Sequence, residues 1–137
     1  MRTTKWIGIA VLLASMVVGQ GCALLVVGAV GAAGAAGAVS YVGNELHVTQ
    51  EVSVDRAWNA ALASMQDLQF RLIRDKTVKD ATGGVVNAYN AKDQRIIIQL
   101  ARQSDTVTEI RIRVGTFDTT ANRDLARLIY DKMRAHL

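Results

Sequence analysis

The chain has 137 residues, of which half are hydrophobic and a fifth are charged, with no proline and a single cysteine. This length leaves room for one domain, and the composition excludes a disordered chain, a collagen-like chain and a disulfide-stabilised scaffold. Charge is unevenly placed: only Arg2 and Lys5 precede Glu45, and no charged residue lies between Trp6 and Asn44. The sequence therefore joins an uncharged N-terminal piece to a charged C-terminal piece, which fits neither a multidomain enzyme nor a polytopic membrane protein.

The first 21 residues have the pattern of a secretory signal peptide. Arg2 and Lys5 supply the positive start, and the apolar run from Trp6 to Val18 has 13 residues. That length fits the ~7–15 residues of a signal-peptide core and is too short for a transmembrane helix. Small residues follow, ending in Gly21, as a signal peptidase requires. We therefore predict a leader over residues 1–21.

Cys22 comes directly after this leader and is the only cysteine, so no disulfide can form within the chain. The stretch from Val18 to Cys22 resembles the lipobox of bacterial lipoproteins. Gly21 matches its small residue before the cysteine, whereas Gly19 stands where a Leu-like residue is usual. The resemblance implies cleavage before Cys22 and attachment of acyl chains such as palmitate. An uncleaved anchor with Cys22 buried as a small hydrophobic residue stays open as the alternative.

Residues 22–43 form the second region, in which 20 uncharged residues (23–42) are rich in glycine and alanine. Such a stretch is long enough to cross ~30 Å of hydrocarbon as a helix, and its small residues allow close packing against other helices. Repeated glycines also weaken a helix by ~1 kcal/mol each. Three interpretations stay open: a tether, a shallow membrane insertion, or a membrane helix that self-associates.

From residue 44 onward the sequence has the periodicity of a folded domain, which we assign to residues 44–137. Apolar residues alternate in some segments and recur at helical spacing in others. Turn residues separate these segments, including Gly83-Gly84, Asn90–Asp93 and Ser104-Asp105. The elements predicted in chain order are a strand over 45–54, a helix over 55–68, a strand beginning at Phe70, strands over 85–91, 94–102 and 106–115, and a last helix after Thr119.

This order, β-α-β-β-β-β-α, predicts an α+β fold with a mostly antiparallel sheet and both helices on one face. Ser53 or Asp55 is expected to cap the first helix. The side chains expected in the core are Trp58, Ala61, Leu62, Met65 and Leu68 of the first helix, Ile96, Ile98, Leu100, Ile110, Ile112 and Val114 of the strands, and Ala121, Leu125, Leu128, Ile129 and Met133 of the last helix.

Most of the chain resembles a family of small, uncharacterised bacterial lipoproteins that carry a domain of unknown function. The resemblance rests on the small-residue segment after Cys22, on Val54-Asp55-Arg56-Ala57-Trp58, and on the run from Thr108 to Gly115 followed by Phe117-Asp118 and an amphipathic helix. It implies no activity. Ala23 after Cys22, where an Asp signals inner-membrane retention in some lipoproteins, implies the outer membrane, with the domain facing the periplasm.

One surface of the predicted sheet is a candidate binding site. If Ile110, Ile112 and Val114 are buried, the intervening arginines face the other way. The side chains expected on this face are Tyr89, Arg95, Arg111 and Arg113. They predict a surface for an anionic partner, such as a phospholipid headgroup, lipopolysaccharide or an acidic envelope protein. A plain polar face turned to water is the open alternative.

No pattern points to catalysis, a cofactor or a metal. Glu45, His47 and Glu51 share a strand face but are spaced too widely for one tight site without a partner strand. His136 lies near a helix C-terminus, where a cation is favoured, so we expect a capping role. Nucleophile and phosphate-loop signatures are missing from the sequence. We therefore expect a protein that is not an enzyme.

The sequence predicts a lipid-anchored protein of the bacterial cell envelope whose domain is structural or binds a partner. The membrane is the expected partner through acyl chains on Cys22, and no nucleic acid is expected, because an exported protein does not meet it. The alternative is a membrane-embedded homo-oligomer assembled through the glycine- and alanine-rich segment.

Overall fold

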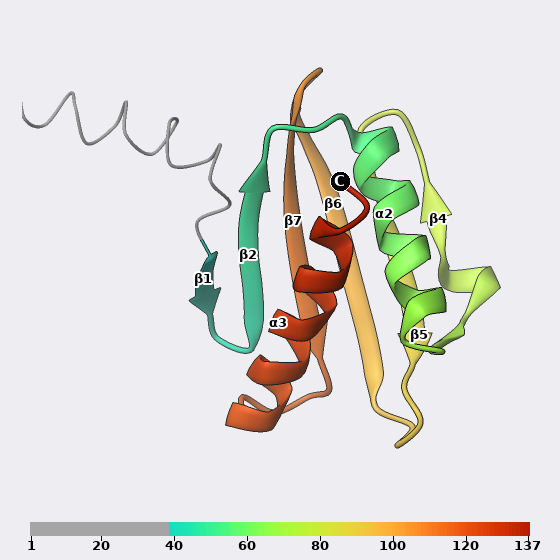
Figure 1. Cartoon of the computed structure of the whole chain (residues 1–137), viewed down its shortest axis with the longest axis vertical. Coiled ribbons are helices and arrows are strands. Elements are labelled where there is room, and N and C mark those ends of the chain that lie inside the picture. The colour runs from blue at the N-terminus through green and yellow to red at the C-terminus, as the bar shows by residue number, and fades with distance from the viewer. Residues whose placement is uncertain (1–38) are drawn as a thin grey trace, which may run out of the picture. The chain divides into compact units, whose positions relative to one another are not determined.

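The computed structural model of the protein describes residues 39–137, in which two helices pack on one face of a sheet (Figure 1). The chain divides into units of residues 1–33 and 34–137, and the described residues belong to the second. The predicted leader, Cys22 and the glycine- and alanine-rich residues up to 38 lie outside the described residues. Within residues 39–137, no helix is long and apolar enough to cross a membrane.

The sheet has seven strands, and every pairing in it is antiparallel. Its order is β1-β2-β7-β6-β5-β3, with β4 also paired to β5. This arrangement confirms the predicted α+β fold. The elements are β1 (Val39–Val42), β2 (Glu45–Gln50), α2 (Val54–Asp67), β3 (Arg71–Leu72), a 3-10 turn (Arg74–Lys76), β4 (Val78–Lys79), β5 (Gly83–Tyr89), β6 (Arg95–Ser104), β7 (Val107–Val114) and α3 (Thr120–Arg134).

The pairing of β2 with β7 joins the two ends of the domain sequence. Leu46 lies opposite Ile112, and Val48 lies opposite Ile110. The strands β5, β6 and β7 follow one another as hairpins, whereas β2 and β7 are separated along the chain by α2 and four strands. Side chains far apart in the sequence therefore become neighbours along this seam.

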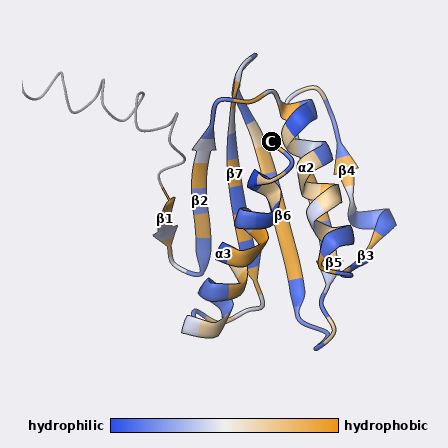
Figure 2. Ribbon diagram, viewed as in Figure 1, coloured by the Kyte–Doolittle hydropathy of each residue, from blue (hydrophilic) through white to orange (hydrophobic). Residues whose placement is uncertain are grey.

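The core lies between the sheet and the two helices, as the alternation of apolar residues predicted. Bands of hydrophobic and hydrophilic residues alternate along β2 and β7 in Figure 2. Ile96, Ile98, Ile110 and Ile112 are all fully buried. Because side chains alternate between the faces of a strand, the residues between them must face away from the helices.

In α3 the predicted buried stripe is partly wrong. Ile129 and Met133 are buried as expected, but Leu128 is 44% exposed. Ala121, also expected inside, is exposed. Ala126 and Tyr130 take the places against the sheet, because the helix is rotated slightly from the orientation that the leucines alone suggested.

Strand β1 lies in the segment that the sequence analysis treated as a tether or membrane insertion. Val39 lies opposite Val48 and packs against the core, and Tyr41 donates a hydrogen bond to the backbone oxygen of Arg123 at 3.3 Å. The sheet thus begins at Val39, ahead of the predicted domain start at residue 44. The missed strand carries no charge, so its composition does not distinguish it from the uncharged sequence before it.

The sequence suggested a turn at Gly83-Gly84, but in the structure this pair begins β5. The turn lies just before it, where the Asp80 carboxylate accepts hydrogen bonds from the backbone of Thr82 and Gly83 at 2.7 and 3.0 Å. A Cβ atom at Gly84 would lie 2.7 Å from the ring of Trp58. The glycine therefore lets the half-buried tryptophan of α2 lie flat against β5.

Both helices begin at hydroxyl caps. Ser53, one of the two predicted candidates, accepts a hydrogen bond from the backbone of Arg56 at 3.3 Å, and Thr119 accepts one from Asn122 at 3.2 Å. Between β7 and α3, Gly115 has a φ of +64°, a left-handed conformation that favours glycine, and its N–H donates to the Arg95 carbonyl at 2.8 Å. This turn holds the loop of residues 116–119 beside β6.

Candidate functional site

The face of the sheet opposite α2 and α3, here called the outer face, carries the charged residues of β2 and β7. Across these strands Arg113 lies opposite Glu45, and Arg111 lies opposite His47. On the other side of β7, Ile97 and Gln99 of β6 lie opposite the same two arginines. The register between strands distant in sequence therefore decides which charges meet.

Each of the two β7 arginines holds one carboxylate. Arg113 donates from Nε to Glu45 at 2.8 Å and also binds it through Nη2. Arg111 binds both oxygens of Glu109, from Nε and Nη2, at 2.9 Å each. These hydrogen bonds stabilise the ionised carboxylates, so Arg113 lowers the pKa of Glu45 and Arg111 lowers the pKa of Glu109.

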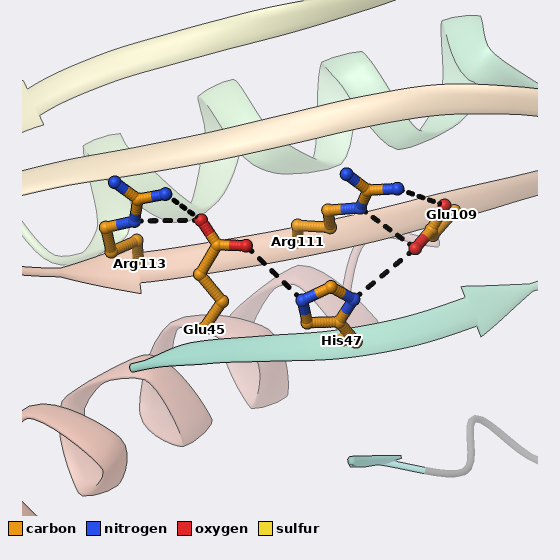
Figure 3. A network of polar contacts seen from close by, with 5 residues as sticks. All are labelled: Glu45, His47, Glu109, Arg111 and Arg113. Carbon is orange, nitrogen blue, oxygen red and sulfur yellow. Dashed lines mark hydrogen bonds and ion pairs between the residues drawn. The ribbon is translucent and has the colours of Figure 1, made fainter. Parts of the chain in front are cut away.

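The His47 ring lies between these two ion pairs and links them (Figure 3). Its Nε2 is 3.3 Å from Glu45 and its Nδ1 is 3.4 Å from Glu109. The side chains of Glu45, His47 and Glu109 are 17–21% exposed. A neutral imidazole has only one N–H, so it can donate to just one of the two carboxylates. We call the five residues Glu45, His47, Glu109, Arg111 and Arg113 the outer-face network.

Of the three residues that share a strand face in the sequence, Glu45, His47 and Glu51, the first two belong to the outer-face network. The partner strand β7 supplies the groups that a single strand lacked, and Glu51 lies beyond the end of β2, exposed. Two arginines neutralise two glutamates, so the network carries little net charge. In the described part of the chain no group of His, Cys, Asp and Glu side chains is arranged to hold a metal ion.

The four residues predicted to bind an anion all lie on the outer face, but they differ in the groups that they already contact. Arg111 and Arg113 already hold carboxylates. Arg95 donates to the neutral amide of Asn87 at 2.8 Å and forms no ion pair with any residue in 39–137. Tyr89 lies opposite Arg95, and the guanidinium of Arg71 stacks over its ring at 5.5 Å. Arg95 is therefore the arginine of this set whose charge no described carboxylate neutralises.

Two hollows open on this side of the domain. One, of about 420 Å³, lies between β4, β5 and β6, with Arg111 in its lining. The other, of about 190 Å³, lies at the end of β6 and β7, where Arg95 and Arg113 meet the loops around Asn44 and Thr116. The second hollow thus contains Arg95, which no described carboxylate neutralises, and Arg113, which is bound to Glu45.

The second histidine is far from this network. His136 follows α3 and contacts the Asp67 carboxylate at the end of α2, with Nε2 and Oδ2 2.7 Å apart. The sequence suggested that His136 caps α3, but in the structure its side chain joins the two helices. Arg56 of α2 reaches the backbone oxygen of Leu137, so both contacts fasten the last residues to the same helix.

Glu45, His47 and Glu109 were missed as a group because they come from two strands about 60 residues apart in sequence. Alternation along β2 placed Glu45 and His47 on one face, and alternation along β7 placed Glu109 beside Arg111. The alternation within each strand does not indicate that β2 pairs with β7.

Comparison with curated proteins finds no match for the chain. A protein-family model matches residues 5–132, which include the apolar run from Trp6 to Val18, Cys22, every described strand and most of α3. The family is described as a protein of unknown function, DUF3568. The chain, with its uncharged N-terminal piece and its helix-covered antiparallel sheet, belongs to this family.

Proposed function

We propose that the protein is a lipid-anchored component of the bacterial cell envelope, held in the outer membrane by acyl chains on Cys22, with its domain in the periplasm. The observation that carries the proposal is the lone cysteine directly after a 13-residue apolar run and Gly21. The family match supports it, because the match begins at residue 5 and so includes this run together with the domain. Several acyl chains make release from a membrane very slow.

We infer that the domain itself is structural or binds a partner. General acids need a raised pKa near the working pH, whereas arginines lower the pKa of both Glu45 and Glu109. Tyr130, whose pKa is raised by burial, lies in the core and bonds Gln50. These groups suit a rigid scaffold better than a reaction centre.

The uncovered face of the sheet is the surface we assign to a partner. Arg95 offers a charge that no described carboxylate neutralises, and Tyr89 and Arg113 lie near it. An envelope protein with an acidic patch or an anionic lipid fits this chemistry. Arg111 is not assigned to this surface, because it lies outside the hollow of Arg95 and Arg113 and lines the one between β4, β5 and β6.

The mass of the mature protein tests the anchor. Purified from bacterial membranes, the chain should have the mass of residues 22–137 plus its acyl chains. Labelled palmitate should enter the parent and the Ser15→Ala control but not Cys22→Ala. Recovery of a chain that begins at Met1 and carries no lipid, or labelling that survives Cys22→Ala, would contradict the proposal.

A membrane-embedded oligomer remains the alternative, and β1 restricts it. With Val39–Val42 in the sheet, residues 23–38 are the part of the uncharged segment left to span a bilayer, fewer than the ~20 that a membrane helix needs. This alternative therefore requires the leader to stay attached. Crosslinking in membranes should then give a ladder that Gly31→Leu with Gly34→Leu abolishes, whereas a monomer in both cases excludes it.

A further inference from the structure

Two loops at one end of the domain each expose an apolar side chain. Val42, at the end of β1, is 63% exposed, and Phe117, in the loop between β7 and α3, is 76% exposed. The side-chain amide of Asn44 donates to the backbone oxygen of Thr116 at 3.2 Å, which fastens the two loops together. We call residues 42–44 and 115–117 the tip.

The tip is held in place by the fold. The Gly115 N–H bonds the carbonyl of Arg95, and Tyr41 bonds the backbone of α3 at Arg123. Asp118, directly after Phe117, is ion-paired with Arg123, with Nη2 and Oδ2 2.6 Å apart. Phe117 is therefore presented to the outside without a free carboxylate beside it. The tip therefore presents two exposed apolar side chains, Val42 and Phe117, on loops that these bonds hold in place.

A cationic hollow lies directly beside the tip. Arg95 and Arg113 line it together with Asn44 and Thr116, which belong to the tip itself. Arg113 shares its charge with Glu45, whereas Arg95 bonds only the amide of Asn87 among the described residues. Two guanidinium groups against one carboxylate leave a net positive charge. Guanidinium groups bind phosphate through paired hydrogen bonds.

We propose that the tip docks on an anionic phospholipid surface, with Phe117 and Val42 in the interfacial layer and a lipid phosphate at Arg95 and Arg113. The partner must present anionic groups and apolar matter side by side, and a bilayer of anionic lipids does so across its whole surface. This inference rests on the proposed membrane attachment, which would keep the domain close to the bilayer. Docking would then fix the orientation of the domain relative to the membrane.

Hydrogen exchange of the full chain mixed with lipid nanodiscs tests docking, whether the chain is anchored in the discs or free. In discs that contain phosphatidylglycerol, exchange in peptides covering residues 41–44 and 115–119 should slow relative to discs of phosphatidylcholine alone. Exchange in the peptide covering Val78–Lys79 of β4 should be the same in both. Equal exchange at the tip in the two kinds of disc overturns the inference.

Variants separate the tip from general charge and hydrophobicity. Arg95→Gln should weaken docking about fivefold, the effect of one basic residue at an anionic surface. Arg111→Gln removes the same charge but lies outside the hollow, so it should leave the protection unchanged. Phe117→Ser should reduce the protection, and the control Val78→Ser, at a site 59% exposed in β4, should not. Equal effects of Arg95→Gln and Arg111→Gln would contradict the site.

Two further outcomes would assign the tip to another partner. Protection that inorganic phosphate produces without lipid would show a plain anion site and overturn membrane docking. Protection that depends on the number of chains per disc and not on lipid charge would show contact between copies, with the same consequence. The mass of the chain distinguishes a failure of the lipid anchor from a failure of docking, because the mass does not depend on the tip.

Discussion

The inner and outer faces of the sheet are built from alternate residues of the same strands, but different forces hold them. In β7, Ile110 and Ile112 are fully buried against the helices, whereas Glu109 and Arg111, which alternate with them, form an ion pair on the uncovered side. The inner face removes apolar surface from water, which is worth about 1.5–3 kcal/mol for each fully buried isoleucine. Partly exposed ion pairs contribute roughly 0–1 kcal/mol.

Buried apolar side chains therefore lie on one face of this domain and charged side chains on the other. The inner face should dominate the free energy of unfolding, since many buried side chains contribute to it. The outer face contributes little to stability and is therefore free to present charge. Substitutions on the two faces should differ accordingly, and those with the largest expected effect test the separation first.

Replacing a core isoleucine tests the inner face most strongly. Ile112→Ala removes a fully buried side chain at the centre of the β2–β7–β6 seam and leaves a cavity. We expect the free energy of unfolding to fall by about 2–5 kcal/mol, measured by urea unfolding of the purified chain. The adjacent outer-face substitution Arg111→Ala is the control, with an expected loss below about 1 kcal/mol. Comparable losses at both positions would contradict the separation of the faces.

Gly84→Ala tests the packing of α2 on the sheet. The added Cβ would lie 2.7 Å from the Trp58 ring, so the helix or the ring must shift. We expect a loss of about 1–3 kcal/mol, typical of overpacking. In a Trp58→Leu background the same substitution should cost clearly less, because the colliding ring is gone. Equal costs in both backgrounds would show that Gly84 is needed for another reason.

The sequence predicted the inner face well because the information is local. Alternation placed Ile96, Ile98, Ile110 and Ile112 inside, and turn residues separated the hairpins of β5, β6 and β7 correctly. The short strands β1 and β4 were missed. Each has few residues, and each exists because a longer neighbouring strand offers it hydrogen bonds. No local pattern marks such strands.

The outer-face network could be predicted only in part, for a related reason. The arginines of β7 were placed on the outer face by alternation alone. Their neutralisation by Glu45 and Glu109, and the position of His47 between these carboxylates, depend on β2 pairing with β7 in one register. A slip of one residue would turn all these side chains to the other face. The charge left on Arg95 was therefore visible only in the folded protein.

Acid should remove the stability that the ion pairs of the outer face contribute, while the apolar packing of the inner face does not titrate. Arg113 and Arg111 lower the pKa of Glu45 and Glu109, so both carboxylates contribute stability above their unfolded pKa of about 4.3. This contribution disappears as the pH falls through the lowered folded values. The two arginines are 40–43% exposed, so screening limits the total to about 1 kcal/mol.

The measurement compares the parent with Glu45→Gln/Glu109→Gln. At pH 7 the parent should be the more stable in urea, and the difference should shrink as the pH falls below about 4.3 and through the lowered folded pKa values. Asp55, Asp80 and Asp118 also have a lowered pKa through their own hydrogen bonds, and they add equally to the acid sensitivity of both proteins. A difference that stays constant down to pH 3 would show that the network does not stabilise the ionised glutamates.

The smallest expected effect concerns α3, where the buried stripe differs from the one that leucine spacing suggested. Leu128 is 44% exposed, whereas its neighbour Ile129 is fully buried. Leu128→Gln should therefore change the free energy of unfolding by less than about 0.5 kcal/mol, as at ordinary surface positions. Ile129→Gln should be strongly destabilising in the same urea assay, since it buries an amide without partners. If Leu128→Gln costs as much as Ile129→Gln, α3 packs on the sheet through the stripe that the sequence suggested, and the exposed face of the helix is assigned incorrectly.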